Sequence, residues 1–233
     1  MNNKVVILAG GKGKRFRPFS FFLPKPLMPI GENPIIYYLI NIFKKNKFKN
    51  FIFSLGYQSE LMKAYLGTGS KFNVKIKYLD ENKPLGTAGP LSLIKNYIKK
   101  NDFFFIINGD IYTEINFNKM MKFAKTGNYD LVVGYVRHKH KSSFGELNIN
   151  NNIINKIFEK PERFINASSG IYIIKNSKNL SIVKKNTFYT MPQLINNYIT
   201  RGLKVGAFRI SGFWMGIENI DNIKEVSKRL LKV

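Results

Sequence analysis

The sequence predicts an α/β fold built on a mixed, mainly parallel sheet with flanking helices. Short apolar runs of strand length alternate with longer segments of helical period through the first 130 residues. After residue 130 the pattern changes to shorter, more closely spaced strands. Repeated strand–helix–strand units require right-handed crossovers, so the first half is expected to form a Rossmann-like parallel sheet covered on both faces.

The expected elements of the first half follow one another at regular intervals. Its strands are predicted at 4–9, 51–55, 74–78 and 103–108, and its helices at 34–47, 59–66 and 89–99. Pro34 favours a helix start there, because its missing N–H lies in the first turn, where no intrahelical bond is lost.

The second half is predicted to be a smaller, more antiparallel part. Its strands are expected at 130–137, 144–149, 153–158 and 170–174, with a closing helix in "NIKEVSKRLLKV". The run "NINNNI" indicates a hairpin turn between two of these strands. Because no repeat or linker interrupts the chain, one domain over 1–233 is expected, with halves of about 1–130 and 131–233.

Composition limits the class of protein. The chain has 233 residues, 44% of them hydrophobic, and no cysteine, which excludes disulfides and thiolate metal sites. No apolar run approaches the roughly 20 residues of a membrane span, and the N-terminus lacks the features of a signal peptide. These observations predict a cytoplasmic protein.

The net charge of +24 allows two interpretations. Clustered lysines could neutralise nucleic-acid phosphates. However, the lysines are spread along the whole chain beside many Asn, Ile, Phe and Tyr residues, a bias typical of A/T-rich coding sequence. No helix-turn-helix, finger or RNP-like pattern accompanies them. We therefore expect no nucleic-acid partner, although the charge would still attract small anionic substrates.

A glycine-rich turn follows the first predicted strand in "VVILAGGKGKRF". Gly10, Gly11 and Gly13 lack a Cβ, so their backbone N–H groups can approach an anion closely. Lys14 and Arg15 would add charge-assisted bonds to phosphate oxygens. The turn matches neither the Walker loop nor the G-x-G-x-x-G fingerprint. An ordinary strand-to-loop turn with solvated lysines stays open as the alternative.

Asp110 is the best metal candidate among the residues. It follows an apolar strand and Gly109, at the carboxyl end where α/β sheets place ligands. A carboxylate there can hold Mg²⁺ against phosphate oxygens. The structural alternative is an Asp that caps a helix or a turn.

Several short motifs together resemble the sugar-1-phosphate nucleotidylyltransferases. They occur in the order and at the intervals typical of that family and extend over nearly the whole chain: "LAGGKGKRFRP", "PKPLMP", "PLGTAGPLSLI", "NGDIYTEINF", "FGELNI", "IFEKP" and "GFWMGIENIDN". The resemblance implies the nucleotide-diphospho-sugar transferase type of fold, with a sugar-binding second half. The implied reaction joins a nucleoside triphosphate to a sugar 1-phosphate and gives an NDP-sugar and pyrophosphate, with Mg²⁺ as cofactor.

The resemblance also assigns roles to particular residues. Arg15 matches the arginine that stabilises the leaving pyrophosphate, Lys25 the lysine that contacts the α-phosphate, and Asp110 a metal ligand, and these are the expected catalytic residues. The expected nucleotide-binding residues are Leu8, Ala9, Gly10, Gly11, Gly13, Lys14, Arg15, Glu81, Gly86, Thr87 and Asp110. The expected sugar-phosphate-binding residues are Gly145, Glu159, Lys160 and Asn166.

One motif departs from the family pattern. Where the family usually has W-x-D, this chain has Trp214, Met215 and Gly216, so the second carboxylate for the metal is missing. Glu218 is the candidate substitute. An impaired relative that binds an NDP-sugar and regulates a partner therefore remains an alternative to the active enzyme.

The choice of base depends on Glu81. Guanine presents N1–H and N2–H₂ donors side by side, which suit an acceptor-only carboxylate, and "PLGTAGPL" looks most like the mannose-1-phosphate guanylyltransferases. GTP and mannose 1-phosphate are therefore favoured. A uridylyl- or thymidylyltransferase acting on glucose 1-phosphate is the alternative, as is Glu81 as a solvated loop acid. The chain's length suggests a catalytic domain alone, and a homodimer is compatible with the sequence.

Overall fold

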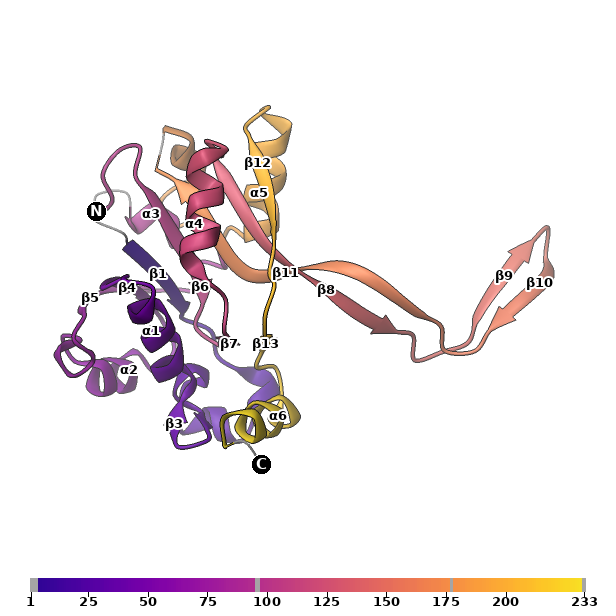
Figure 1. The fold of residues 1–233 in the computed structure, drawn as a ribbon, viewed down its shortest axis with the longest axis horizontal. Coiled ribbons are helices and arrows are strands. Elements are labelled where there is room, and N and C mark those ends of the chain that lie inside the picture. Colours follow the sequence, from indigo (N-terminus) through magenta and orange to yellow (C-terminus); the bar gives the residue numbers. More distant parts are fainter. Residues whose placement is uncertain (1–3, 95–96, 177, 232–233) are drawn as a thin grey trace.

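The central feature of the computed structural model is a seven-stranded sheet. The model describes residues 4–94, 97–176 and 178–231. The strand order is β12-β8-β11-β6-β1-β4-β5 (Figure 1). The bounds are β1 Lys4–Ala9, β4 Asn50–Leu55, β5 Lys75–Asp80, β6 Phe103–Asn108, β8 Leu131–Lys141, β11 Glu162–Lys175 and β12 Val205–Arg209.

The sheet is mixed in the way the sequence predicts. Strand β1 pairs in parallel with β4 and β6, β4 pairs in parallel with β5, and β12 pairs in parallel with β8. Strand β11 runs antiparallel to both β6 and β8. Because β8, β11 and β12 join the same sheet as the earlier strands, both halves of the chain share one core. The predicted α/β fold class is confirmed.

Helices cover both faces of the sheet. On one face α1 (Ile35–Lys45), α2 (Ser59–Leu66) and α4 (Phe117–Thr126) pack against alternate strand residues. On the other face α3 (Leu91–Ile94) and α5 (Met191–Thr200) pack against the intervening strand residues, whose side chains point to that face. In β1, for example, Val5 and Ile7 enter the first layer while Val6 enters the second, as the two-residue period of a strand requires.

A third apolar cluster supports the segment that follows β1. It joins Phe16, Met28 and Tyr112 to Val226 of α6 (Ile220–Leu231). The short strands around it are β2 Pro29–Ile30, β3 Asn33–Pro34, β7 Ile111–Thr113 and β13 Trp214–Gly216. The 3₁₀ turns of the chain are η1 Lys14–Phe16, η2 Phe19–Phe21, η3 Lys25–Leu27, η4 Ser70–Phe72 and η6 Lys178–Ile182.

The predicted helix at 89–99 is wrong in extent, since only Leu91–Ile94 is α-helical among its described residues. The N–H groups of Ala88 and Gly89 both donate to the carbonyl oxygen of Tyr189, so a long-range contact replaces a helical start. Residues 95–96 of that prediction lie outside the described residues, as do 232–233 of the closing helix. Helices α4 and α5 lie outside the predicted elements.

Strands β8 and β11 continue beyond the sheet as a two-stranded ribbon (Figure 1). At its far end lies the predicted hairpin, formed by β9 (Glu146–Asn150) and β10 (Ile153–Phe158). We call residues 137–166, which comprise ribbon and hairpin, the arm. No helix in the described part of the chain is both long and apolar enough to cross a membrane.

Candidate active site

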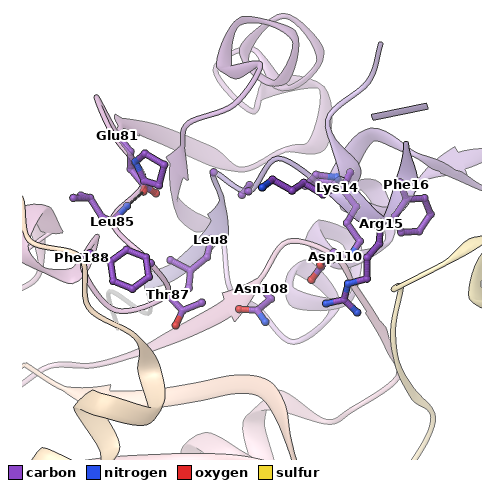
Figure 2. Close-up of a pocket in the computed structure, with 18 residues that line it drawn as sticks. Leu8, Lys14, Arg15, Phe16, Glu81, Leu85, Thr87, Asn108, Asp110 and Phe188 are labelled. Carbon is purple, nitrogen blue, oxygen red and sulfur yellow. Dashed lines mark hydrogen bonds and ion pairs between the residues drawn. The ribbon is translucent and has the colours of Figure 1, made fainter. Parts of the chain in front are cut away.

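A cavity of about 430 Å³ lies at the carboxyl ends of β1 and β6. All the residues predicted to bind the nucleotide line it, namely Leu8, Ala9, Gly10, Gly11, Gly13, Lys14, Arg15, Glu81, Gly86, Thr87 and Asp110. Lys25 lines it as well. Figure 2 shows Glu81, Leu85 and Phe188 at one end of the cavity and Arg15 and Asp110 at the other. The roles assigned to these residues stay predictions.

Glycine is required at position 10 because a carboxylate lies against it. A Cβ on Gly10 would be 2.9 Å from Glu81 Oε1 and 3.3 Å from the backbone nitrogen of Gly56. Gly13 is needed for a different reason, since its φ of +58° lies in the left-handed region that side chains disfavour. The turn after β1 therefore depends on two glycines with separate physical roles.

Glu81 is positioned by two hydrogen bonds. Ser54 Oγ donates to Oε1 at 2.8 Å, and the Leu85 N–H donates to Oε2 at 3.2 Å. Burial raises the pKa of the Glu81 carboxyl above its usual value, and these two bonds oppose the shift. A carboxylate that is partly desolvated but still has free lone pairs is suited to accept further hydrogen bonds from a ligand.

The loop at 84–89 is held by a distant segment of the chain. Met191 donates its N–H to Thr87 Oγ1 at 2.7 Å, and Tyr189 donates its N–H to the Leu85 carbonyl at 2.9 Å. Gly86 has a φ of +76°, and a Cβ there would lie 2.7 Å from the Tyr189 carbonyl oxygen. This contact brings the Phe188 ring into the cavity wall.

Lys25 and Asp110 form the most buried ion pair of the site. Lys25 Nζ lies 2.5 Å from Asp110 Oδ2, with the two side chains 14% and 31% exposed. Pro24 and Pro26 flank Lys25 at the start of η3, which restricts the backbone that carries the cation. The structure therefore places a preorganised positive charge beside the predicted metal ligand.

Arg15 forms an ion pair with Glu218. Both side chains are mostly exposed, and such surface pairs contribute little to stability. Arg15 can therefore exchange this partner for an anionic ligand at small cost. In this conformation the carboxylate of Glu218 is directed to Arg15, and its role as a metal ligand stays a prediction.

The residues present fit a magnesium site of the kind completed by substrate. No group of three or more His, Cys, Asp or Glu side chains that could hold a metal ion occurs among the residues described. Mg²⁺ usually needs only one or two carboxylates when phosphates and water supply the other ligands. Asp110 supplies one, and Ile217, next to Gly216, donates its N–H to the Asp110 carbonyl at 2.9 Å. Gly216 therefore lies next to the site.

The structure places the predicted sugar-phosphate residues outside the cavity. Gly145, Glu159, Lys160 and Asn166 all lie on the arm. Lys160 Nζ lies 3.8 Å from Glu159 Oε1, and a Cβ on Gly145 would lie 3.4 Å from Glu159 Oε2. Three of the four residues are thus brought together, while Asn166 lies farther along the ribbon, opposite Arg137.

Several cavity residues lie outside the predicted set. Asn108 ends β6 two residues before Asp110, so its position in the "NGD" motif was the available signal. Phe16 follows the predicted Arg15 directly. Phe188 carries no local signal, because the backbone contacts of its neighbour Tyr189 with the loop at 84–89 bring it to the cavity wall. Ser54 does not line the cavity but positions Glu81, and it carries no local signal either.

Fold and cavity together define an α/β protein with a nucleotide-sized cleft at the carboxyl edge of its parallel strands. A family model described as nucleotidyl transferase matches residues 4–233. The chain belongs to the nucleotidyl transferase family.

Relatives of known name give the comparison more detail. The chain is 30% identical over 228 residues to a mannose-1-phosphate guanyltransferase of Debaryomyces hansenii, covering 92% of this chain and 60% of that protein. It is also 30% identical over 221 residues to a probable mannose-1-phosphate guanylyltransferase of Oryza sativa, covering 92% and 61%. The chain thus spans about three fifths of the length of these relatives.

Two solved structures share the fold over nearly the whole chain. A putative glucose-1-phosphate thymidylyltransferase from Bacillus anthracis, in complex with a sucrose, superposes with a TM-score of 0.80 at 25% identity, covering 99% of this chain and 96% of that one. HddC from Yersinia pseudotuberculosis, complexed with GMP-PN, superposes with a TM-score of 0.77 at 26% identity, covering 98% and 99%.

Proposed function

We propose that the chain is a sugar-1-phosphate nucleotidylyltransferase that uses GTP, with mannose 1-phosphate as the leading sugar substrate. The observation that carries the proposal is the cavity itself, in which a glycine turn, Lys25, Arg15 and Asp110 meet at the end of a parallel strand. Phosphoryl groups need this combination of backbone donors, cations and a metal-holding carboxylate.

The proposed reaction is an in-line displacement. An oxygen of the sugar 1-phosphate attacks the α-phosphorus of the triphosphate, the bond to the β-phosphate breaks, and pyrophosphate leaves. Lys25 stabilises the charge that develops on the α-phosphate, and Arg15 stabilises the pyrophosphate. Asp110, with Glu218 as a second candidate, would hold Mg²⁺, which supplies positive charge to the phosphates when bound.

The preference for guanine depends on Glu81. Each of its carboxylate oxygens accepts one hydrogen bond from the chain and keeps further capacity, so both remain available to guanine N1–H and N2–H₂. The separation of Glu81 from Asp110 along the cavity suits a nucleotide with its base at one end and its phosphates at the other (Figure 2). The names of the relatives and the GMP-PN complex of HddC support a guanine nucleotide.

The direct test is pyrophosphate release with Mg²⁺, using GTP, UTP, dTTP, CTP or ATP against a panel of sugar 1-phosphates. We expect the highest kcat/KM for GTP with mannose 1-phosphate. Exclusive use of a pyrimidine triphosphate with glucose 1-phosphate would instead support a uridylyl- or thymidylyltransferase, an alternative that the similarity to the putative thymidylyltransferase favours.

Glu81→Gln is expected to raise the KM for GTP by about tenfold or more, because an amide replaces one acceptor with a donor that faces guanine donors. Glu60→Gln, on the exposed side of α2, is the matched control. An unchanged KM for GTP would remove Glu81 from base recognition.

The pH dependence of GTP binding should report the same residue. Burial raises the pKa of Glu81, so its carboxylate is protonated, and lost as an acceptor, at a higher pH than an ordinary glutamate. The KM for GTP should therefore rise as pH falls through that pKa in the wild type. Glu81→Gln should show no such step, and an identical step in the variant would contradict the assignment.

Gly216→Asp should lower the Mg²⁺ concentration needed for the half-maximal rate, because it restores a second carboxylate next to Asp110. The substitution has room, since a Cβ on Gly216 would meet only the Trp214 ring, at 3.7 Å. The measurement is a magnesium titration of both proteins, with Gly216→Asn as the uncharged control. Equal half-saturation in all three proteins would show that position 216 does not face the metal.

The absence of a carboxylate at Gly216 also favours a second candidate, an impaired relative that binds an NDP-sugar without transfer. The same titration separates the two functions. A wild type that is inactive at every magnesium concentration and is activated by Gly216→Asp would identify the binder.

A further inference from the structure

The hairpin of the arm has one wholly apolar face. Ile149 lies opposite Ile154, and Leu147 lies opposite Ile157, in the register of β9 and β10. Residues directly opposite each other share a face, and these four aliphatic side chains are between 48% and 61% exposed. The neighbouring residue Ile153 pairs with Asn150 on the other face.

Such a hairpin is poorly suited to stand alone. A two-stranded hairpin is at best marginally stable in water unless a surface covers its apolar face. Clustered exposed aliphatic side chains of this kind mark an interaction site. Figure 1 shows the hairpin far from the sheet and from the helices that cover it, so the body of the same chain does not cover this face.

The ribbon holds the hairpin in this position. Five register pairs, from Arg137 opposite Asn166 to Lys141 opposite Glu162, continue the β8–β11 ladder beyond the residues of β8 that pair with β12. At roughly 3.3 Å per residue the ribbon spans about 16 Å. The ladder holds the arm extended from the body of its own chain, where a second molecule can meet it (Figure 1).

A second exposed apolar surface lies beside the cavity. Segment 19–23 exposes four large apolar side chains, Phe19, Phe21, Phe22 and Leu23, and Phe22 is 75% exposed. The segment adjoins the glycine turn, since a Cβ on Gly13 would lie 3.3 Å from Ser20 Cβ. The chain therefore carries two exposed apolar surfaces, one on the arm and one next to the cavity.

The cavity also lacks a group that the proposed reaction needs. Glu159 and Lys160, the residues expected to bind the sugar phosphate, directly follow β10 at the base of the hairpin and do not line the cavity. A hairpin docked on segment 19–23 would bring both residues to the cavity edge. Because the ribbon holds the hairpin away from the body of its own chain (Figure 1), a hairpin that docks there belongs to a second copy.

We propose that two copies of this chain form a two-fold dimer by exchanging arms. The apolar face of each hairpin packs on segment 19–23 of the other copy, and Glu159 and Lys160 complete the sugar-phosphate site of that copy. An exchange of identical elements satisfies both surfaces at once in a closed, symmetric dimer. What the two residues do there rests on the proposed function, whereas the packing of the arm does not.

The first test is the oligomeric state by sedimentation. The wild type should be a dimer, and Ile154→Asn should shift it to monomer, since the amide lies in the packed face. Ile153→Asn is the matched control, with the same substitution one residue away on the opposite face. A monomeric wild type, or equal effects of the two substitutions, would overturn the proposal. Added salt should strengthen the dimer, because screening weakens the repulsion between chains of net charge +24.

The second test is cross-linking, which needs no enzymatic activity. The chain has no cysteine, so single thiols can be placed freely. Phe22→Cys and Ile154→Cys, carried on chains of different mass and mixed, should be joined by a short bis-maleimide. Ile153→Cys in place of Ile154→Cys should give much less of the mixed product. Docking within one chain would give no mixed product and would refute the exchange.

The third test is complementation between two defective variants. Lys25→Ala removes a cavity residue, and Lys160→Ala removes an arm residue. A dimer purified through a different tag on each chain would contain one intact cavity facing one intact arm, so about half of the wild-type activity should return. If each site were built from one chain alone, the mixed dimer would recover no activity. An inactive wild type would contradict the proposed function alone, and the cross-linking would still decide whether the arms exchange.

Discussion

Lys25→Ala is expected to reduce turnover by about 10²-fold or more while the protein remains folded. The Lys25 side chain is mostly buried, its Nζ lies 2.5 Å from Asp110 Oδ2, and two prolines flank it. The position of its positive charge is therefore fixed before substrate arrives. The loss of one preorganised donor to a developing negative charge typically costs this much. Steady-state kinetics and the thermal unfolding midpoint measure the two parts of the prediction.

The control for Lys25→Ala must separate the loss of a charge inside the cavity from the change in the net charge of the protein. Lys122→Ala removes the same charge from the exposed side of α4 and should leave kcat unchanged. Arg15→Ala should cost a similar factor as Lys25→Ala, with little loss of stability, because its ion pair with Glu218 is exposed. Wild-type rates in both active-site variants would remove these residues from the mechanism.

Asp110→Asn is expected to abolish metal-dependent activity. The amide keeps the shape of the side chain but removes the charge that would hold Mg²⁺. It also leaves Lys25 without its counter-ion, which makes the metal site more positive and less able to bind a cation. The rate should fall further than in Lys25→Ala or Arg15→Ala, and a raised Mg²⁺ concentration should restore little of the lost activity.

Asp80→Asn is a matched control for that substitution. Asp80 ends β5 and, like Asp110, pairs with a lysine, since its Oδ2 lies 3.0 Å from Lys63 Nζ, but it does not line the cavity. Its substitution should leave turnover unchanged. Ordinary activity of Asp110→Asn at ordinary Mg²⁺ would make Asp110 a structural residue.

The glycine turn and Asp110 could be predicted to share one cavity because the signals for both are local. The glycine turn follows directly from a strand whose apolar run ends at Ala9, and Asp110 follows β6 with only Gly109 between them. Parallel neighbours place their carboxyl ends at one edge of a sheet, so local placement was enough to bring the two together. The same argument could not find Phe188, which enters through a contact between two loops.

The length of α3 and the position of the arm had no comparable local signal. Helical period alone predicts a helix over 89–99, yet the bonds from Ala88 and Gly89 to Tyr189 replace its first turn. The hairpin turn was predicted from "NINNNI", but its distance from the cavity was not. That distance comes from the ribbon, whose pairs join residues far apart in sequence.

The sequence by itself determined the α/β class, the succession of the main strands, the glycine turn after β1 and the place of Asp110 after β6, because side-chain period and backbone freedom act over a few neighbouring residues. Glu81, Gly86 and Thr87 were predicted only from the resemblance to the family. Only the tertiary structure decided that Glu81 lies against Gly10, that Arg15 pairs with Glu218 and that Lys25 lines the cavity while Lys160 does not. These relations depend on how distant segments pack, and packing is a property of the whole chain rather than of any one stretch.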